Sequence, residues 1–185
     1  NYVIKDIITS EPLLLDELAN LLVLQNDRAW SGNVELVVSP AIGALVFGGM
    51  LAHHLGCRFV FTEKDSSGTH IVRASLSPIL KAKRVLIVED VVTSGQTISE
   101  VADLVIVLGA EVVGFSALWL RGGNVSTAYP LVSLIQRVLP DWGEEDCPLC
   151  KQYIEINIEY GHGKEFLEKY GTNPENWPAN KVSNR

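Results

Sequence analysis

The sequence predicts an α/β fold with a mostly parallel central sheet flanked by helices. Short apolar runs rich in valine, isoleucine and leucine alternate along the chain with longer segments whose apolar residues have helical spacing. This alternation favours strands joined by crossover helices, and therefore a parallel sheet. The chain has 185 residues, 47% of them hydrophobic, which is enough for one domain with a sizeable core.

The first half of the chain is predicted to hold two helices and two strands. Ser10 precedes an amphipathic segment as its N-cap, and Gly56 marks the end of a second helix. A buried strand is expected to end at a Ser39-Pro40 turn. In chain order, we expect a helix over 11–25, a strand over 34–38, a helix over 43–56 and a strand over 58–62.

The second half of the chain is predicted to continue the alternation. We expect a strand over 84–88, a helix over 97–109 and strands over 111–120 and 131–139. Between the halves, the polar segment 63–70 contains a glycine and two serines, which indicates an exposed, mobile loop. From Pro140 onward the chain is richer in charge, proline, asparagine and aromatic residues, and its pattern assigns no element.

Composition narrows the class of protein. A net charge of −7 argues against a general binder of nucleic acid or of anionic membranes. No apolar run reaches the roughly 18 residues of a membrane span, and no secretory signal is visible. Three cysteines, an odd and small number, favour a reducing cytoplasm. Because the chain starts at Asn1 and its only methionine is Met50, we expect an N-terminal segment upstream.

The stretch VLIVEDVVTSGQT, residues 85–97, carries the most chemistry. Glu89 and Asp90 follow a buried apolar run, at the sheet edge where α/β proteins bind ligands. The hydroxyl- and glycine-bearing segment 93–97 lies where the next helix begins, and free N–H groups at a helix start suit a phosphate. Carboxylates accept hydrogen bonds from a sugar diol. Together these groups match the requirements of a ribose 5-phosphate.

Other phosphate-binding motifs do not fit this stretch. It lacks the G-x-x-x-x-G-K-[ST] of a P-loop and the G-x-G-x-x-G of a dinucleotide site. A plain strand, acidic turn and capped helix is the remaining structural interpretation. Two acids directly after a four-residue apolar run are costly in a plain turn, because buried charges need partners. The ligand-binding interpretation is therefore favoured.

Residues 85–97 resemble the phosphoribosyl-diphosphate (PRPP) binding motif of type I phosphoribosyltransferases: an apolar run, two acids, two residues and a Thr/Gly-rich phosphate loop. Gln96 departs from it, since many members carry a second glycine there. Further motifs across nearly the whole chain are similar to those of orotate phosphoribosyltransferases: YVIKD (2–6), VSPAIGA (38–44), TEK (62–64), LRGG (120–123), DCPLC (146–150) and GHGKEFL (161–167).

The resemblance implies a type I phosphoribosyltransferase fold with a small hood region. It implies a single domain over 1–185, with a core at about 30–140 and a hood from the N-terminal segment and C-terminal residues. The implied reaction transfers ribose 5-phosphate from PRPP to orotate, giving orotidine 5'-monophosphate and pyrophosphate, with Mg²⁺ as cofactor. The implied assembly is a cytoplasmic homodimer that binds neither nucleic acid nor membrane.

The resemblance also implies roles for the site residues. Lys64, Glu89 and Asp90 are the implied catalytic residues, with Mg²⁺ held through PRPP and by the two acids directly or through water. Lys5, Thr93 and Arg121 are implied to bind orotate, because a planar guanidinium suits a carboxylate. The implied PRPP-binding residues are Lys5, Ser39, Pro40, Ala41, Lys64, Glu89, Asp90, Val91, Val92, Thr93, Ser94, Gly95, Gln96 and Thr97.

The segment 63–70 is expected to close over this site. Lys64, with His70 and Arg73, would then cover the pyrophosphate. In a homodimer, each site would borrow Lys64 from the neighbouring chain. Many relatives have a richly basic loop here, whereas this one holds one lysine and one histidine.

Several alternatives stay open. The substrate could be another base, although a purine has no carboxylate for Arg121 to bind. The chain could instead sense PRPP without turnover, although such regulators often carry a DNA-binding segment that this acidic chain does not show. Cys147 and Cys150 have the spacing of half a zinc site, but a second cysteine pair is missing, so packing is favoured. His53 and His54 are expected in helix-surface or packing roles.

Overall fold

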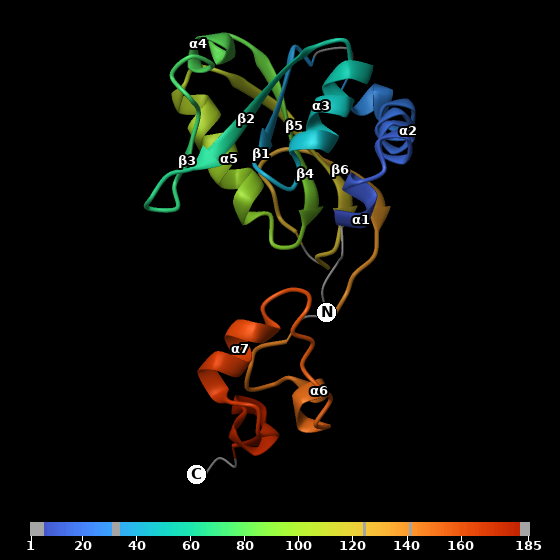
Figure 1. Cartoon of the computed structure of the whole chain (residues 1–185). Helices are drawn as coiled ribbons and strands as arrows, with labels where there is room; N and C mark the ends of the chain where they lie inside the picture. The colour runs from blue at the N-terminus through green and yellow to red at the C-terminus, as the bar shows by residue number, and fades with distance from the viewer. Residues whose placement is uncertain (1–5, 31–33, 124, 141, 182–185) are drawn as a thin grey trace. The chain divides into compact units, whose positions relative to one another are not determined.

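Helices and strands alternate along the chain, as the sequence pattern predicts. The structure is a computed structural model that describes residues 6–30, 34–123, 125–140 and 142–181 (Figure 1). The strands are Leu36–Pro40 (β1), Arg58–Lys64 (β2), His70–Ile71 (β3), Arg84–Val92 (β4), Glu111–Leu120 (β5) and Leu131–Gln136 (β6). The helices are Asp6–Thr9 (α1), Pro12–Trp30 (α2), Leu45–His54 (α3), Ser77–Leu80 (α4), Gln96–Val107 (α5), Pro148–Lys151 (α6) and Gly163–Tyr170 (α7), with 3-10 turns at Pro174–Asn176 (η1) and Pro178–Asn180 (η2).

The strands form one sheet in the order β3-β2-β1-β4-β5-β6. All neighbours are parallel except β2 and β3, which form an antiparallel pair at one edge. This arrangement confirms the predicted α/β fold. The chain passes from β1 to β2 on one side and returns to β4 on the other, so the order reverses between β1 and β4. In open α/β sheets, ligands bind beyond the carboxyl ends of the strands at such a reversal.

The sheet is covered on both faces. Helix α5 packs on one face, over a core of apolar residues from β1, β2, β4 and β5, and helices α2 and α3 pack on the other (Figure 1). Strand β4 shows the alternation: Ile87 belongs to the α5 side, and Leu86 and Val88 belong to the α2–α3 side. This burial on both faces explains why β4 begins as a continuous apolar run.

Several strands and helices begin or end at other residues than predicted. Strand β4 runs to Val92, so Glu89 and Asp90 lie within the strand rather than after it, because β5 continues to pair alongside them. Ser39 and Pro40 end β1 instead of forming a turn. Helix α2 extends to Trp30, and the Ser10 hydroxyl donates to the Ile7 carbonyl rather than capping α2.

The predicted loop over 63–70 is a short hairpin. Glu63 and Lys64 belong to β2, and Lys64 pairs with His70 of β3. Asp65 closes the turn, since its Oδ1 accepts hydrogen bonds from the Ser67 N–H (2.8 Å), the Ser67 hydroxyl (2.6 Å) and the Thr69 N–H (3.0 Å). The tip is exposed, as predicted, and the short Asp65 side chain satisfies N–H groups of the turn.

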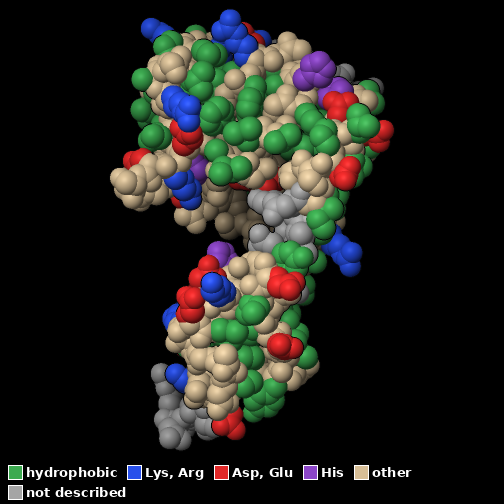
Figure 2. Space-filling model, in the orientation of Figure 1, with side chains coloured by type: hydrophobic (Ala, Val, Ile, Leu, Met, Phe, Trp, Pro, Cys, Tyr) green, Lys and Arg blue, Asp and Glu red, His purple; other side chains and the backbone are tan. Residues whose placement is uncertain are grey.

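The chain divides into two compact units. Among the described residues, one unit lies within 6–138 and contains the sheet, and the other lies within 139–181. The second unit packs Phe166 against Tyr170 and Trp177, with ring centroids 4.9 and 5.8 Å apart. On the face that Figure 2 shows, basic and acidic side chains are interspersed over the surface of each unit. The predicted core and hood boundaries remain predictions.

The cysteine pair lies in the second unit. The Cys147 Sγ accepts the Cys150 N–H at 3.3 Å and so caps α6. Burial and the neighbouring Cys147 raise the pKa of the Cys150 thiol to about 12. No group of three or more His, Cys, Asp or Glu side chains that could hold a metal occurs within the described residues. These contacts support the packing interpretation of the pair.

None of the helices that the structure describes combines the length and the apolar composition that crossing a membrane requires.

Two adjacent glycines in α3 give a matched test of packing beneath the ligand-binding edge. A Cβ on Gly48 would lie 2.0 Å from the Ser39 Oγ and 2.9 Å from a Phe59 ring carbon. We expect Gly48→Ala to lower the free energy of unfolding by up to about 2 kcal/mol, since overpacking costs about 1–3 kcal/mol and the gain in helix propensity is about 1 kcal/mol. Urea unfolding measures the difference.

Gly49→Ala is the control for this substitution. Its Cβ would lie 3.9 Å from the same ring, in ordinary contact. Gly49→Ala is therefore expected to leave stability unchanged or to raise it by up to about 1 kcal/mol. If Gly48→Ala were the more stable variant, the close approach of α3 to β1 would be wrong.

Candidate active site

The loop between β4 and α5 encloses a small hollow. Gly95 has a φ of +83° and caps α5, a backbone conformation that favours glycine. The hollow has a volume of about 120 Å³ and is lined by Glu89, Val91, Val92, Thr93, Ser94, Gly95, Gln96, Thr97 and Ile98. At about 30 Å³ per water, it holds roughly four waters, which is the scale of a phosphate group.

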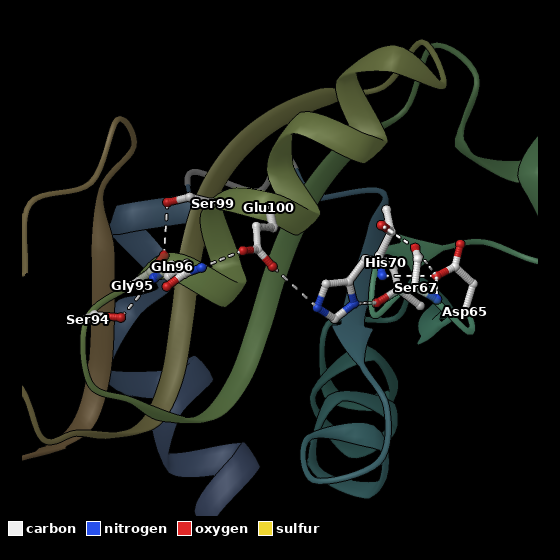
Figure 3. Close-up of polar contacts among 10 residues, drawn as sticks. Asp65, Ser67, His70, Ser94, Gly95, Gln96, Ser99 and Glu100 are labelled. Carbon is white, nitrogen blue, oxygen red and sulfur yellow. Dashed lines mark hydrogen bonds and ion pairs between the residues drawn. The ribbon is translucent and has the colours of Figure 1, made fainter.

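The start of α5 presents donors to this hollow. The Gln96 N–H points to the Ser94 Oγ at 3.3 Å, a long hydrogen bond that a better acceptor would replace. The Gln96 side chain turns away along the helix and donates to Glu100 Oε1 at 2.8 Å (Figure 3). Gln96 therefore does not fill the hollow with its amide.

The acid pair is buried. Glu89 is 9% exposed and Asp90 is 2% exposed. Glu89 Oε1 accepts the Asp90 N–H at 3.1 Å, and Asp90 Oδ1 accepts the Val91 N–H at 2.7 Å. Two adjacent carboxylates at this depth are costly for folding, which indicates a ligand-binding role. Glu89 also lines the phosphate-sized hollow.

The loop after β1 lies beside this site, since β1 and β4 are neighbours. The Ala41 N–H donates to the Thr62 carbonyl at 2.8 Å, and the peptide between Ala41 and Ile42 is cis. Ser39 is fully buried, and its hydroxyl lies beside Gly48 of α3. Ser39 therefore supports the loop by packing. Pro40 is buried beside it, Ala41 is half-buried, and Ile42 is the exposed residue of this loop.

Arg121 follows the carboxyl end of β5, on the same side of the sheet as the hollow and the acid pair. Its backbone N–H donates to the Val92 carbonyl at 2.8 Å, which ties it to the start of the β4–α5 loop over 93–97. The Arg121 Nε is buried, and no hydrogen-bond partner reaches it among the residues that the structure describes. Such a buried donor calls for an acceptor, which a ligand carboxylate provides.

The predicted cations are not all directed at one point. Lys64 is exposed at the end of β2, and Lys5 lies outside the described residues. Arg73 instead forms a two-pronged pair with Glu63, at 2.7 and 2.5 Å, and lies over the Phe61 ring. This pairing lowers the pKa of Glu63 and raises that of Arg73.

His70 is buried rather than exposed over the site. Its Nδ1 lies 3.0 Å from the Thr62 Oγ1, which is also buried. The structure therefore assigns His70 to the support of the hairpin, where the sequence predicts a contact with pyrophosphate. His54 likewise joins α3 to α2 through Asp16 at 2.8 Å, in agreement with its predicted packing role.

Sequence reasoning missed two residues that shape the site. A Cβ on Gly122 would lie 1.9 Å from the Thr93 carbonyl oxygen, so glycine lets the β5 end approach the phosphate loop. Glu100 holds the Gln96 side chain one helical turn away. The i, i+4 spacing of Gln96 and Glu100 was the available signal for the second contact.

The strand order reverses between β1 and β4, and the buried acid pair and the phosphate-sized hollow lie there. These are the features of an α/β protein with a candidate ligand site at the carboxyl ends of its strands. Residues 5–149 match the family model of the phosphoribosyl transferase domain. The chain belongs to this family.

Curated relatives and solved structures agree with this assignment. The chain is similar to the orotate phosphoribosyltransferases of Caldanaerobacter subterraneus (35% identical over 124 residues, 66% of this chain and 64% of the relative) and Thermotoga maritima (37% over 123 residues, 66% and 65%). The matches thus span slightly less than two thirds of these relatives.

Among solved structures, orotate phosphoribosyltransferase from Aeropyrum pernix matches with a TM-score of 0.62 and 21% identity, over 73% of this chain and 78% of that one. Adenine phosphoribosyltransferase from Rhodothermus marinus matches with a TM-score of 0.57 and 25% identity, over 69% and 82%. The first likeness, at this identity, supports the fold.

Proposed function

We propose that this protein transfers ribose 5-phosphate from PRPP to orotate and releases pyrophosphate. The observation that carries the proposal is the grouping of three features at the carboxyl ends of the parallel strands. They are the buried pair Glu89 and Asp90, the hollow at the start of α5, and the buried Nε of Arg121. These match a ribose diol, a 5-phosphate and the carboxylate of a base. The relatives named orotate phosphoribosyltransferase support the choice of base.

The phosphate of PRPP is proposed to occupy the hollow. Backbone N–H groups at the start of α5 and the hydroxyls of Thr93, Ser94 and Thr97 would donate to its oxygens. The positive end of the α5 dipole adds to this attraction. Because the protein carries a net charge of −7, such local donors are needed to hold an anionic substrate.

The ribose is proposed to lie against the acid pair. Glu89 and Asp90 accept hydrogen bonds from the ribose hydroxyls directly or through the water shell of Mg²⁺. Two carboxylates are oxygen donors of the kind that Mg²⁺ prefers, so the pair fits this ion. When bound, Mg²⁺ neutralises charge on pyrophosphate as it leaves. The chain itself holds the ribose in line with the attacking nitrogen of orotate.

Orotate and pyrophosphate are proposed to occupy opposite sides of the ribose. Arg121 would hold the orotate carboxylate, with Thr93 and Lys5 beside the base. Pro40 and Ala41 would contact pyrophosphate through the backbone, and Lys64 would add the positive charge that stabilises it as it departs. The free thiols of Cys57, Cys147 and Cys150 are consistent with a proposed place in the reducing cytoplasm.

A second candidate is the same transfer to a purine. The likeness to adenine phosphoribosyltransferase structures favours it. Arg121 argues against it, because an uncharged purine would leave the buried Nε without an anionic partner.

Replacement of Arg121 tests the choice of base. We expect Arg121→Ala to weaken orotate binding by about ten- to a hundredfold, since hydrogen bonds to charged groups contribute about 1.5–3 kcal/mol. PRPP binding should change by less than about threefold, because the Arg121 contact to the phosphate loop is a backbone hydrogen bond that alanine keeps. Separate calorimetric titrations of the two substrates measure this.

Arg58→Ala is the matched control, since Arg58 is exposed at the start of β2, the end of the strand away from the site. It should bind both substrates like the parent. Equal weakening of orotate and PRPP by Arg121→Ala would contradict the assignment.

We also propose a homodimer in which each site receives Lys64 from the neighbouring chain. The support is the exposure of Lys64 and of the whole hairpin tip over 65–69. We expect Lys64→Ala and Asp90→Asn each to be nearly inactive alone. On mixing, hybrid dimers carry one site with both an intact Asp90 and an intact Lys64, so activity should return toward a quarter of the parent value for random exchange.

Subunit exchange is verified separately, with differently tagged chains. Exchange without recovery of activity would show that Lys64 acts within its own chain.

A further inference from the structure

A chain of polar contacts runs from the phosphate loop to the hairpin. Gln96, the first residue of α5, donates to Glu100 Oε1 at 2.8 Å. The other oxygen, Glu100 Oε2, lies 3.9 Å from the His70 Nε2. The His70 Nδ1 lies 3.0 Å from the Thr62 Oγ1. Figure 3 shows Glu100 between Gln96 on one side and His70 on the other.

The histidine end of this chain is buried and incomplete. His70 is 5% exposed, and its Nε2 has no hydrogen-bond partner among the residues described. Burial and the charge of Lys64 lower the pKa of His70, so the ring is neutral at neutral pH. If Nδ1 accepts from the Thr62 hydroxyl, the Nε2 carries the proton and faces Glu100. Shortening 3.9 Å to about 2.9 Å would complete this hydrogen bond.

The hairpin connects His70 directly to Lys64. The two residues are register partners in an antiparallel pair, so their side chains lie on the same face of the sheet. The turn between them is closed by the Asp65 side chain. Thr62, the partner of His70, also accepts the Ala41 N–H through its carbonyl. A shift at His70 therefore reaches both Lys64 and the loop after β1.

The Glu100 end of this series of polar contacts would respond to charge in the hollow. Glu100 lies one turn beyond Gln96 and is 45% exposed at its side chain, so it has room to move. A phosphate bound at the start of α5 brings negative charge close to Glu100. Like charges repel, which favours a Glu100 position farther from the hollow and closer to His70.

We propose that Glu100 is a positioning residue that couples occupancy of the phosphate hollow to the placement of the β2–β3 hairpin through His70. The proposal rests on the proposed function, since it takes the hollow as the 5-phosphate site. Phosphate binding would move Glu100 toward the His70 Nε2. The completed contact would hold the loop after β1 in place at the same site, and Lys64 in place for the neighbouring site that it is proposed to serve.

Hydrogen exchange with ribose 5-phosphate as the probe tests this without turnover. In the parent, saturating ribose 5-phosphate should slow exchange of the hairpin amides of Asp65, Gly68 and Thr69, which are hydrogen-bonded within the turn. We expect at least about fivefold protection, the lower end of typical coupling between sites. In Glu100→Gln, ribose 5-phosphate should still bind, weakened by no more than about the fivefold of the lost coupling, but hairpin protection should disappear.

Asp103→Asn is the matched control. It removes one negative charge from the exposed face of α5, three residues from Glu100, and should retain the protection. Turnover adds a second readout: Glu100→Gln should lower kcat with little change in the KM for orotate.

The outcomes separate the two claims. Binding of ribose 5-phosphate without hairpin protection in the parent, or full protection in Glu100→Gln, would overturn the coupling and leave the proposed function standing. An equal loss of hairpin protection in Asp103→Asn would show that a general charge effect is responsible, and would also overturn the coupling through Glu100. Failure of ribose 5-phosphate to bind the parent would overturn the proposed function itself.

Discussion

Asp90→Asn is expected to reduce turnover by about a hundred- to a thousandfold, the range found when one preorganised electrostatic contact is removed from an active site. Asparagine keeps the shape of the side chain and an Oδ1 that can accept the Val91 N–H, now at 2.7 Å. It loses the charge that orients the ribose diol and the water shell of Mg²⁺. Because Asp90 is only 2% exposed, relief of a buried charge should keep the melting temperature at or above that of the parent.

Steady-state assays and thermal unfolding on the same preparations measure the two effects. Asp103→Asn makes the same chemical change at an exposed position of α5 and should keep parent activity to within about twofold. An Asp90→Asn protein that melts like the parent and turns over at the parent rate would show that the acid pair is not the ribose site.

Gly122→Ala is expected to reduce kcat/KM for PRPP by about a hundredfold, since a displacement near 1 Å in an active site has effects of this size. The added Cβ would lie 1.9 Å from the Thr93 carbonyl oxygen and 2.7 Å from a Val125 methyl. The first of these atoms is backbone, so the phosphate loop itself must move. PRPP affinity by calorimetry, together with the kinetics, checks the effect.

Gly123→Ala controls for the loss of a glycine in the same segment. Its Cβ would lie 3.5 Å from a Val138 methyl, in ordinary contact, so its kcat/KM should stay within about twofold of the parent. Similar PRPP affinity in both variants would contradict the role given to the close approach of Gly122 to the phosphate loop.

Local sequence patterns predict which strands the fold contains. They predict less well where each strand ends. The apolar run at 85–88 predicts a buried strand, and the structure has it in β4. The inclusion of Glu89 and Asp90 in that strand depends on pairing with β5, which is some 28 residues further along the chain. Such non-local pairing leaves no mark within the segment itself, because it is decided by the partner strand.

The hairpin shows the same limit for the site. A polar segment with glycine and serine predicts exposure, and residues 65–69 are exposed. Lys64 pairs with His70 within the segment itself. The burial of His70 depends on α5, which lies outside the segment. The resemblance places His70 over the pyrophosphate, whereas in the structure its side chain is buried against Thr62.

Arg121 shows where sequence and structure together add most. Its motif assigns it a carboxylate, and the structure adds the buried Nε and the tie to Val92. Neither observation alone distinguishes a clamp from an arginine that packs at a strand end.

The most direct measurement of the central claim is turnover of the full-length protein with PRPP and Mg²⁺ against a panel of bases: orotate, uracil, adenine, hypoxanthine and guanine. Formation of the nucleotide and pyrophosphate is followed by chromatography. The account predicts orotidine 5'-monophosphate and pyrophosphate in equal amounts with orotate, with the other bases at least about a hundredfold slower because they lack a carboxylate for Arg121. Faster turnover of a purine than of orotate, or PRPP binding without turnover of any base, would contradict it.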